Sequence, residues 1–152
     1  MRIAVSCDHA GYILKDTVIQ AIVETGHEPL DLGPYTAERV DFPDSAELVG
    51  KAILDGKADR GILICGSGIG VCIAANKMKG IYASVCHDVY SAHQGVEHDN
   101  MNILCLGGQI IGVQVAKELV RAYLGAEFMD HGNYQRRFGK IQKIEEKGIG
   151  SS

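Results

Sequence analysis

The sequence predicts a Rossmann-like three-layer α/β/α sandwich with a mostly parallel sheet of about five strands. Short apolar runs of strand length alternate with amphipathic stretches along the chain. Because parallel neighbours need crossover connections, which are usually helices, this alternation favours a parallel sheet covered on both faces. A chain of 152 residues without an internal repeat or linker fits one domain covering residues 1–152.

The predicted strands are short runs rich in apolar residues. They cover residues 2–7, 27–33, 60–66, 81–86 and 102–108. The third run, "RGILICG", is apolar at positions that would face both sides of the sheet, which is typical of a central parallel strand.

The predicted helices are amphipathic stretches between these runs. They cover residues 11–26, 41–56 and 112–125, with a shorter segment at 88–98 and a polar C-terminal helix at 134–147. Gly26 and Gly56 stand where helices commonly end, and Pro43 stands where a helix commonly begins. We expect a frayed tail at about residues 148–152.

Composition argues against several classes of function. The net charge of −4 and the pI near 5.8 give no basic footprint for nucleic acid. No apolar run approaches the roughly 18 residues of a membrane span, and the first residues enter a strand without the apolar core of a signal peptide. We therefore expect a cytoplasmic protein that binds neither nucleic acid nor membranes.

The five cysteines do not form a recognisable framework. Their number is odd, and they have neither CxxC nor Cys/His zinc spacing, so we expect no disulfide and no structural zinc. Each is by default a small buried apolar residue. They are Cys7, Cys65, Cys72, Cys86 and Cys105.

Polar residues and glycines follow four of the predicted strands. Asp8 and His9 follow the first strand, residues 65–70 the third, His87 and Asp88 the fourth, and residues 107–108 the fifth. Open α/β sheets bind ligands at the carboxyl ends of their strands. The site is therefore predicted at this edge.

The glycine-rich segment "GSGIGV", residues 66–71, can be compared with three kinds of ligand-binding loop. It lacks the GxGxxG spacing of a dinucleotide fingerprint and the GK[ST] ending of a P-loop. It fits an anion-binding or oxyanion-binding turn, because glycines let backbone N–H groups approach a ligand at a helix start. The alternative is a tight strand-to-helix turn without a ligand.

Cys65 directly precedes this loop, where the positive end of the next helix would lower the pKa of its thiol. A thiolate there can act as a nucleophile, or as a base that removes a proton from the carbon next to a carbonyl. The loop N–H groups would then stabilise the enediolate. Cys72, inside the following helix, is expected in the core.

The histidines have simpler interpretations. His27, His93 and His131 are expected to be structural or solvated. Asp88 is expected to cap the next helix, with His87 behind the site. A metal site built from His87, Asp88, His98 and Asp99 is chemically possible, but no spacing requires it, and we predict neither metal nor cofactor.

Six motifs together resemble one family. They are "CDHAG", "VDFPD", "ICGSGIGVCIAANK", "VCHDVYSA", "EHDNMNIL" and "LGGQIIG". In this order they resemble type B ribose-5-phosphate isomerases and the related galactose-6-phosphate isomerase subunits, over nearly the whole chain. The resemblance implies an aldose–ketose isomerase that works through a cis-enediolate without metal. It also implies a homodimer, or a dimer of dimers, with active sites at the subunit interface.

The resemblance assigns catalytic roles to four residues. Cys65 resembles the base that moves a proton between C1 and C2, and Ser67 resembles a residue that handles the enediol oxygens. His98 resembles the histidine that assists ring opening. Asp8 would bind or protonate the ring and hydroxyl oxygens.

The resemblance also assigns substrate-binding positions. The loop backbone would form the anion hole, through Gly66, Gly68, Ile69 and Gly70. His9 resembles a phosphate contact, and Arg137 resembles an arginine that binds phosphate across the interface.

Several positions depart from the family pattern. Gln109 and Asn133 stand where the family usually has cations, and Phe42 stands where it has tyrosine. Each lost charge-assisted contact weakens phosphate binding by roughly 1.5–3 kcal/mol, unless other cations compensate. Arg39, Arg136 and Lys140 are the candidates for compensation.

Asp99 replaces an asparagine of the family, and Asn100 follows it. A carboxylate in that position would repel an enediolate unless it is protonated or turned away. A second interpretation of the neutral residues is a one-residue insertion near residues 129–133, which would shift the positions matched to the family motif.

The departures leave the substrate open. The reaction would be kept, on ribose 5-phosphate and ribulose 5-phosphate, on another phosphorylated pentose, tetrose or hexose, or on an unphosphorylated sugar. The alternative is a non-catalytic sugar-phosphate-binding subunit. The joint presence of Cys65, Ser67, His98 and Asp8 favours catalysis, because a binding subunit needs no base.

Overall fold

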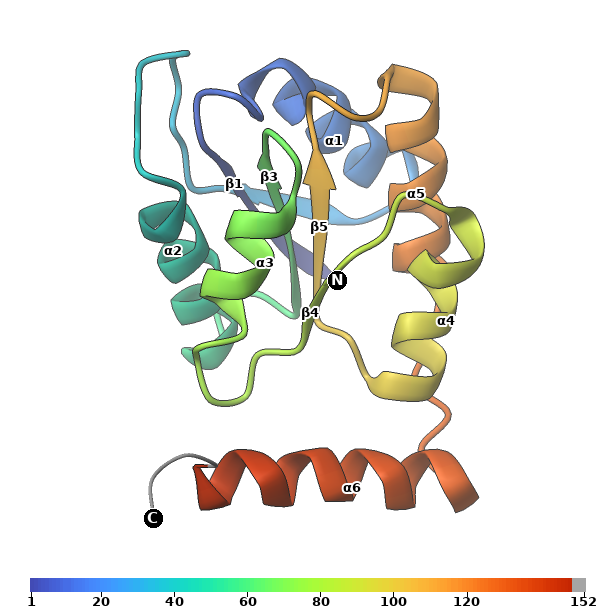
Figure 1. The fold of residues 1–152 in the computed structure, drawn as a ribbon. Helices are drawn as coiled ribbons and strands as arrows, with labels where there is room; N and C mark the ends of the chain where they lie inside the picture. The colour runs from blue at the N-terminus through green and yellow to red at the C-terminus, as the bar shows by residue number, and fades with distance from the viewer. Residues whose placement is uncertain (149–152) are drawn as a thin grey trace.

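Five parallel strands form the centre of the molecule in the computed structural model, which describes residues 1–148 (Figure 1). Their order across the sheet is β2-β1-β3-β5-β4, and every neighbouring pair is parallel. The strands are β1 (Arg2–Cys7), β2 (Glu28–Asp31), β3 (Arg60–Cys65), β4 (Ala83–Val85) and β5 (Ile103–Gly107). The predicted fold class is confirmed, and the paired strands are all parallel.

Helices cover both faces of this sheet, because each crossover returns the chain to the start of the next parallel strand. The helices are α1 (Tyr12–Glu24), α2 (Phe42–Leu54), α3 (Ile69–Ala75), α4 (Val89–Asp99), α5 (Val113–Gly125) and α6 (Gly132–Lys147). Helices α1, α4 and α5 pack on one face, and α2 and α3 pack on the other (Figure 1).

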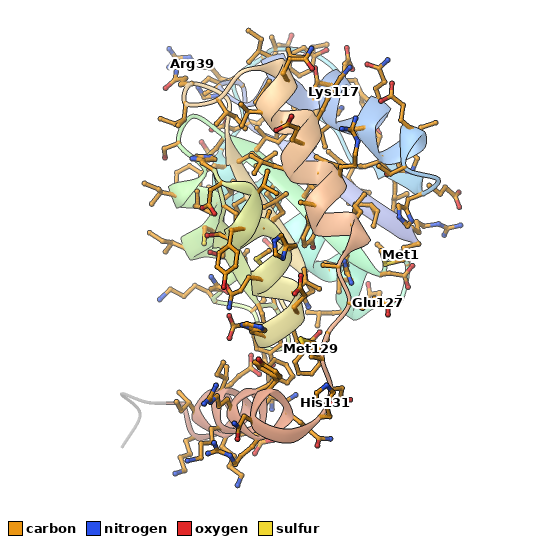
Figure 2. All side chains as sticks on the ribbon, turned by 90° about the vertical axis from the view of Figure 1, so that its right-hand side faces the viewer. Met1, Arg39, Lys117, Glu127, Met129 and His131 are labelled. Carbon is orange, nitrogen blue, oxygen red and sulfur yellow. The ribbon has the colours of Figure 1, made fainter. Side chains whose placement is uncertain are left out.

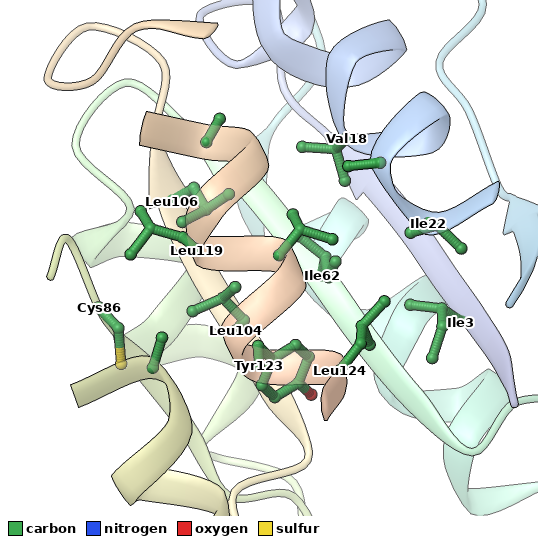
Figure 3. Close-up of a cluster of buried hydrophobic side chains, with 14 of the residues drawn as sticks. Ile3, Val18, Ile22, Ile62, Cys86, Leu104, Leu106, Leu119, Tyr123 and Leu124 are labelled. Atoms are coloured by element: carbon green, nitrogen blue, oxygen red, sulfur yellow. The ribbon is translucent and has the colours of Figure 1, made fainter. Parts of the chain in front are cut away.

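Strand β3 shows why the sheet is buried on both faces. Ile62 and Ile64 belong to the cluster beneath α1, α4 and α5, whereas Leu63 and Cys65 belong to the cluster beneath α2 and α3. This alternation follows from the two-residue repeat of a strand. Figure 3 shows the first cluster, where the Tyr123 hydroxyl donates to the Gly61 carbonyl at 3.2 Å.

Helix α6 does not pack on a face but crosses the amino-terminal edge of the sheet (Figure 1). Phe138 holds it there through edge-to-face contacts with Tyr82 and Phe128. The Glu145 carboxylate accepts from the Gly80 N–H at 2.7 Å and from the Tyr82 hydroxyl at 2.8 Å.

The element boundaries differ modestly from the predicted ones. The predicted strand at 81–86 is reduced to three residues, and the C-terminal helix begins at Gly132 rather than at residue 134. Of the predicted frayed tail, Gly148 caps α6, and residues 149–152 lie outside the described part of the chain. Within residues 1–148, no helix has the length and apolar character that crossing a membrane requires.

Candidate active site

The predicted site residues fall into two groups at opposite edges of the sheet. Parallel strands place their carboxyl ends at one edge, and a crossover helix therefore ends at the other. At the carboxyl edge lie Asp8, His9, Phe42, Cys65, Gly66, Ser67, Gly68, Ile69, Gly70 and Gln109. At the amino edge lie His98, Asp99, Asn100, Asn133 and Arg137.

Figure 2 shows that the two edges lie at opposite ends of the molecule. Arg39 lies at one end of the molecule, in the segment before α2, and His131 lies at the other, beside α6. The single chain therefore does not bring Cys65 and His98 together.

Cys65 is the last residue of β3 and is 4% exposed. Its sulfur accepts a hydrogen bond from the N–H of Gly68 at 3.1 Å. The backbone turns back toward the sulfur because Gly68 has a φ of 82°, a left-handed value that favours glycine. The Ser67 hydroxyl oxygen accepts from the Ile69 N–H at 3.2 Å. The N–H groups of Gly68 and Ile69 thus point back toward the side chains of Cys65 and Ser67.

Glycines bring the loops after β1, β3 and β5 into direct contact. A side chain at Gly11 would overlap the Ile64 carbonyl, and a Cβ at Gly108 would lie 2.7 Å from the Ala10 oxygen. The Gly108 N–H donates to the Cys65 carbonyl at 2.8 Å, and the next N–H donates to the Gly66 carbonyl at 3.0 Å. These three loops therefore form one packed unit around the thiol.

Asp8 lies beside this unit and is 7% exposed. One carboxylate oxygen accepts from the N–H groups of Ala10 at 2.9 Å and Gly11 at 3.0 Å. The Asp8 N–H donates to the Ile64 carbonyl at 3.1 Å, next to Cys65 in the chain. The carboxylate is therefore fixed close to the start of the glycine loop.

Two of the residues that depart from the family pattern lie against the loop. The Phe42 ring packs on Gly70, where an added Cβ would lie 2.8 Å from the ring. The Gln109 side-chain oxygen lies 3.1 Å from the Cβ position of Gly66. Both side chains therefore border the space in front of the loop.

The second group is arranged around the end of α4. The His98 Nδ1 lies 2.8 Å from the amide nitrogen of Gln94, and its ring stacks on Tyr134 with centroids 4.4 Å apart. Asn100 ends the helix in a left-handed conformation with a φ of 54°. Sequence analysis did not identify Gln94, although its position four residues before His98 places it on the same helix face.

Asp99 lines a hollow of about 280 Å³ beside strand β4. Ser91, Gln94 and Ile141 also line this hollow. Arg136 of α6 donates to the Asn133 side-chain oxygen at 3.3 Å. Because Asp99 is the last residue of α4 and Cys65 the last residue of β3, the two lie at opposite edges of the sheet in one chain.

Asp88 caps α4, as predicted. Its carboxylate accepts from the Ser91 N–H at 2.7 Å, and the hydrogen bonds from Ser91 lower the pKa of the Asp88 carboxyl. Because Asp88 begins α4 and His98 lies at its other end, the four-residue metal site considered from the sequence is not assembled. Residues 1–148 contain no group of three or more His, Cys, Asp or Glu side chains placed to hold a metal ion.

The remaining cysteines differ in environment. All five are free thiols. Burial raises the pKa of Cys7 to about 12. Cys72 was expected in the core but is only partly buried, and a hydrogen bond from Cys105 lowers its pKa to about 7. Cys72 is therefore a second thiol to separate from Cys65 by experiment.

Comparison with known proteins identifies the family. The ribose/galactose isomerase family matches residues 3–141. The chain belongs to this family. It is 43% identical over 146 residues to ribose-5-phosphate isomerase B of Escherichia coli, covering 96% of this chain and 97% of that one. The family resemblance found in the sequence is thus confirmed.

Two further relatives show the range of the family. The chain is 41% identical to a D-erythrulose-4-phosphate isomerase of Pectobacterium atrosepticum, with 95% and 93% of the two chains covered. The solved structure of ribose-5-phosphate isomerase B from Clostridium thermocellum matches with a TM-score of 0.93 and 42% identity, covering 97% of this chain and 99% of that one.

Proposed function

We propose that this protein is an aldose–ketose isomerase that interconverts ribose 5-phosphate and ribulose 5-phosphate through a cis-enediolate. The observation that carries the proposal is the Cys65 sulfur, which the Gly68 N–H orients at the mouth of a glycine loop. Membership of the ribose/galactose isomerase family supports the reaction type.

The proton transfer follows from this geometry. The Cys65 thiolate removes the proton from C2 of the open-chain aldose, while the C1 carbonyl oxygen becomes the enediolate oxygen. Ser67 and the loop N–H groups stabilise that oxygen as its charge develops. A proton moves from O2 to O1, and the thiol returns its proton to C1, which gives the ketose. Asp8 accepts hydrogen bonds from the sugar hydroxyls.

A second copy of the chain would complete the site. His98 is the predicted ring-opening residue, yet it lies at the opposite edge from Cys65. An isologous dimer repeats each contact twice, so it can place the amino edge of each chain against the carboxyl edge of the other. We assign Cys65, Ser67, Asp8 and His9 of one copy, with His98 and Arg137 of the other, to each site.

The phosphate contacts leave the choice of sugar to experiment. Gln109 borders the loop with a neutral amide, so phosphate charge must be met elsewhere. Arg136, Arg137 and Lys140 of α6 are available on a second copy. The names of two relatives, one for ribose 5-phosphate and one for D-erythrulose 4-phosphate, make the tetrose phosphate the first alternative substrate.

We also assign the protein to the cytoplasm.

The experiment that tests the proposal is proton exchange by NMR in deuterated buffer. Ribose 5-phosphate, erythrose 4-phosphate and ribose are compared for the native protein, Cys65→Ala and Cys72→Ala. We expect the native protein and Cys72→Ala to label C2 of a phosphorylated aldose and form the ketose, and Cys65→Ala to do neither.

Each other outcome has a definite meaning. Labelling of the tetrose phosphate alone would keep the reaction and replace the substrate. Loss of exchange in Cys72→Ala with retention in Cys65→Ala would overturn the assignment of the base. Saturable binding of sugar phosphate without exchange would favour the non-catalytic subunit.

A further inference from the structure

The end of strand β5 carries a backbone donor that the sheet itself does not satisfy. In a parallel strand, alternate N–H groups point to the same neighbouring strand. The backbone polar groups of Cys105 point toward β4, because its carbonyl accepts a hydrogen bond from the Cys86 N–H at 3.4 Å. The N–H of Gly107 therefore also points toward β4. Strand β4 has already ended at Val85.

The side chain of His87 takes the place of the missing strand. Its Nε2 accepts a hydrogen bond from the Gly107 N–H at 3.0 Å. Burial lowers the pKa of the His87 imidazole and so favours the neutral ring, in which one nitrogen has a lone pair to accept a hydrogen bond. Because Nε2 accepts, the ring proton resides on Nδ1.

The peptide that His87 holds is the one that supports the glycine loop. A Cβ at Gly68 would lie 3.0 Å from the Leu106 carbonyl carbon and 3.3 Å from the Gly107 nitrogen. A Cβ at Gly107 would in turn lie 2.8 Å from the carbonyl group of Ser67. The peptide between Leu106 and Gly107 is therefore packed directly against residues 67–68.

Gly68 is also the residue whose N–H donates to the Cys65 sulfur at 3.1 Å. A continuous series of contacts thus leads from the imidazole to the Leu106–Gly107 peptide, from that peptide to Gly68, and from Gly68 to the thiol. The two end contacts are hydrogen bonds, and the backbones between them lie too close for a Cβ at Gly68 or Gly107, so a shift of the peptide would move the donor of the sulfur.

We propose that His87 is a positioning residue for the reaction: through Nε2 it fixes the Leu106–Gly107 peptide that holds the Gly68 N–H on the Cys65 sulfur. The proposal rests on the proposed function in taking Cys65 as the base. It assigns to His87 no contact with substrate.

A matched pair of polar substitutions tests the acceptor atom. Glutamine places a side-chain oxygen near the position of Nε2, whereas the acceptor of asparagine falls short by about 1.5 Å, one carbon–carbon bond. We expect His87→Gln to keep the native kcat. We expect His87→Asn to lower kcat roughly two- to tenfold with KM little changed, the range that loss of one hydrogen bond represents. His27→Leu, at the amino edge, is the control histidine substitution.

Amide hydrogen exchange gives a readout that needs no substrate. In the native protein the Gly107 and Gly68 amides are expected to exchange slowly. In His87→Asn both should exchange faster by roughly two- to tenfold, while His87→Gln and His27→Leu keep the native rates. Faster exchange at Gly107 alone would overturn the link to the thiol, because the loop would then not depend on the peptide.

Other results also decide the matter. Fast exchange of the Gly107 amide in the native protein would overturn the proposal, and this measurement does not depend on any variant folding. Native kcat and native exchange rates in His87→Asn would also overturn it. An equal loss of kcat in both variants would show that the imidazole itself is required, which contradicts a role through the acceptor alone. If the native protein isomerises no sugar, the proposed function fails, and the exchange rates still decide whether His87 positions the loop.

Discussion

Complementation between two inactive variants tests whether the active site is shared between copies. One variant is Cys65→Ala, altered at the carboxyl edge. The other carries His98→Asn and Arg137→Ala, altered only at the amino edge. Each variant alone has a defect in every site of its own dimer, so we expect both to be inactive toward ribose 5-phosphate.

The magnitude of the recovery follows from the arrangement of the two edges. When equal amounts are unfolded together in urea and refolded, half of the dimers contain one chain of each kind. In such a dimer one site receives both altered edges and the other receives two native edges. The mixture should therefore regain about one quarter of the native activity per chain.

The assay is the rate of ketose formation, followed after refolding by NMR. The matched control mixes Cys65→Ala with Asp8→Asn, which is altered at the same edge as Cys65. No site in that mixture has a native carboxyl edge, so its activity should not exceed the mean of its two components. Recovery no greater than this control in the first mixture would refute the shared site and require Cys65 to act with residues of its own chain.

Three further changes test the fold around the site. Lys15 is 3% exposed and pairs with Asp31 at 2.7 Å, so Lys15→Met should lower the urea-unfolding free energy by about 2–4 kcal/mol, and adding Asp31→Asn should restore part of it. Gly68→Ala should lower the free energy of unfolding by about 1–2 kcal/mol, because Gly68 has a φ of 82° that is strained for alanine. It should also lower kcat; urea unfolding and the isomerase assay measure the two effects. The Asp88 carboxyl has its pKa lowered from 3.8, so it stabilises the fold above pH 4 and loses this effect as the pH falls through the folded value. The urea midpoints of native protein and Asp88→Ala should therefore differ at pH 5–7 and converge in acid; a constant difference would contradict the cap.

The fold could be predicted from the sequence because both of its signals are local. The apolar runs specify strands, and the amphipathic stretches between them require crossovers, which leaves a parallel sheet as the simple solution. The strand order β2-β1-β3-β5-β4 is a matter of long-range pairing, which no local pattern contains.

The candidate site was predictable only in part for the same reason. The strand ends identify the carboxyl-edge residues, since every parallel strand ends at that edge. His98 and Arg137 carry no such signal, and only the family resemblance drew them into the site. His87 was expected behind the site, but its hydrogen bond to Gly107 depends on β4 being only three residues long and ending at Val85.

The distribution of charge connects the proposed dimer to the choice of substrate. The chain has a net charge of −4, yet α6 has more basic than acidic residues, among them Arg136, Arg137 and Lys140. The loop that would receive the sugar is bordered instead by the neutral side chains of Gln109 and Phe42. In the proposed dimer, α6 of the second copy would meet most of the phosphate charge, alongside His9 and Arg39 at the carboxyl edge.

Assembly should therefore matter more for a phosphorylated sugar than for a neutral one. Replacing Arg137 by alanine should raise KM for ribose 5-phosphate by roughly tenfold or more, because a charge-assisted hydrogen bond contributes about 1.5–3 kcal/mol. The same change should leave turnover of unphosphorylated ribose, where it can be measured, nearly unaffected. Equal losses with both sugars would instead show that Arg137 supports the fold of the interface, and the phosphate would have to be bound by cations of the carboxyl edge such as Arg39.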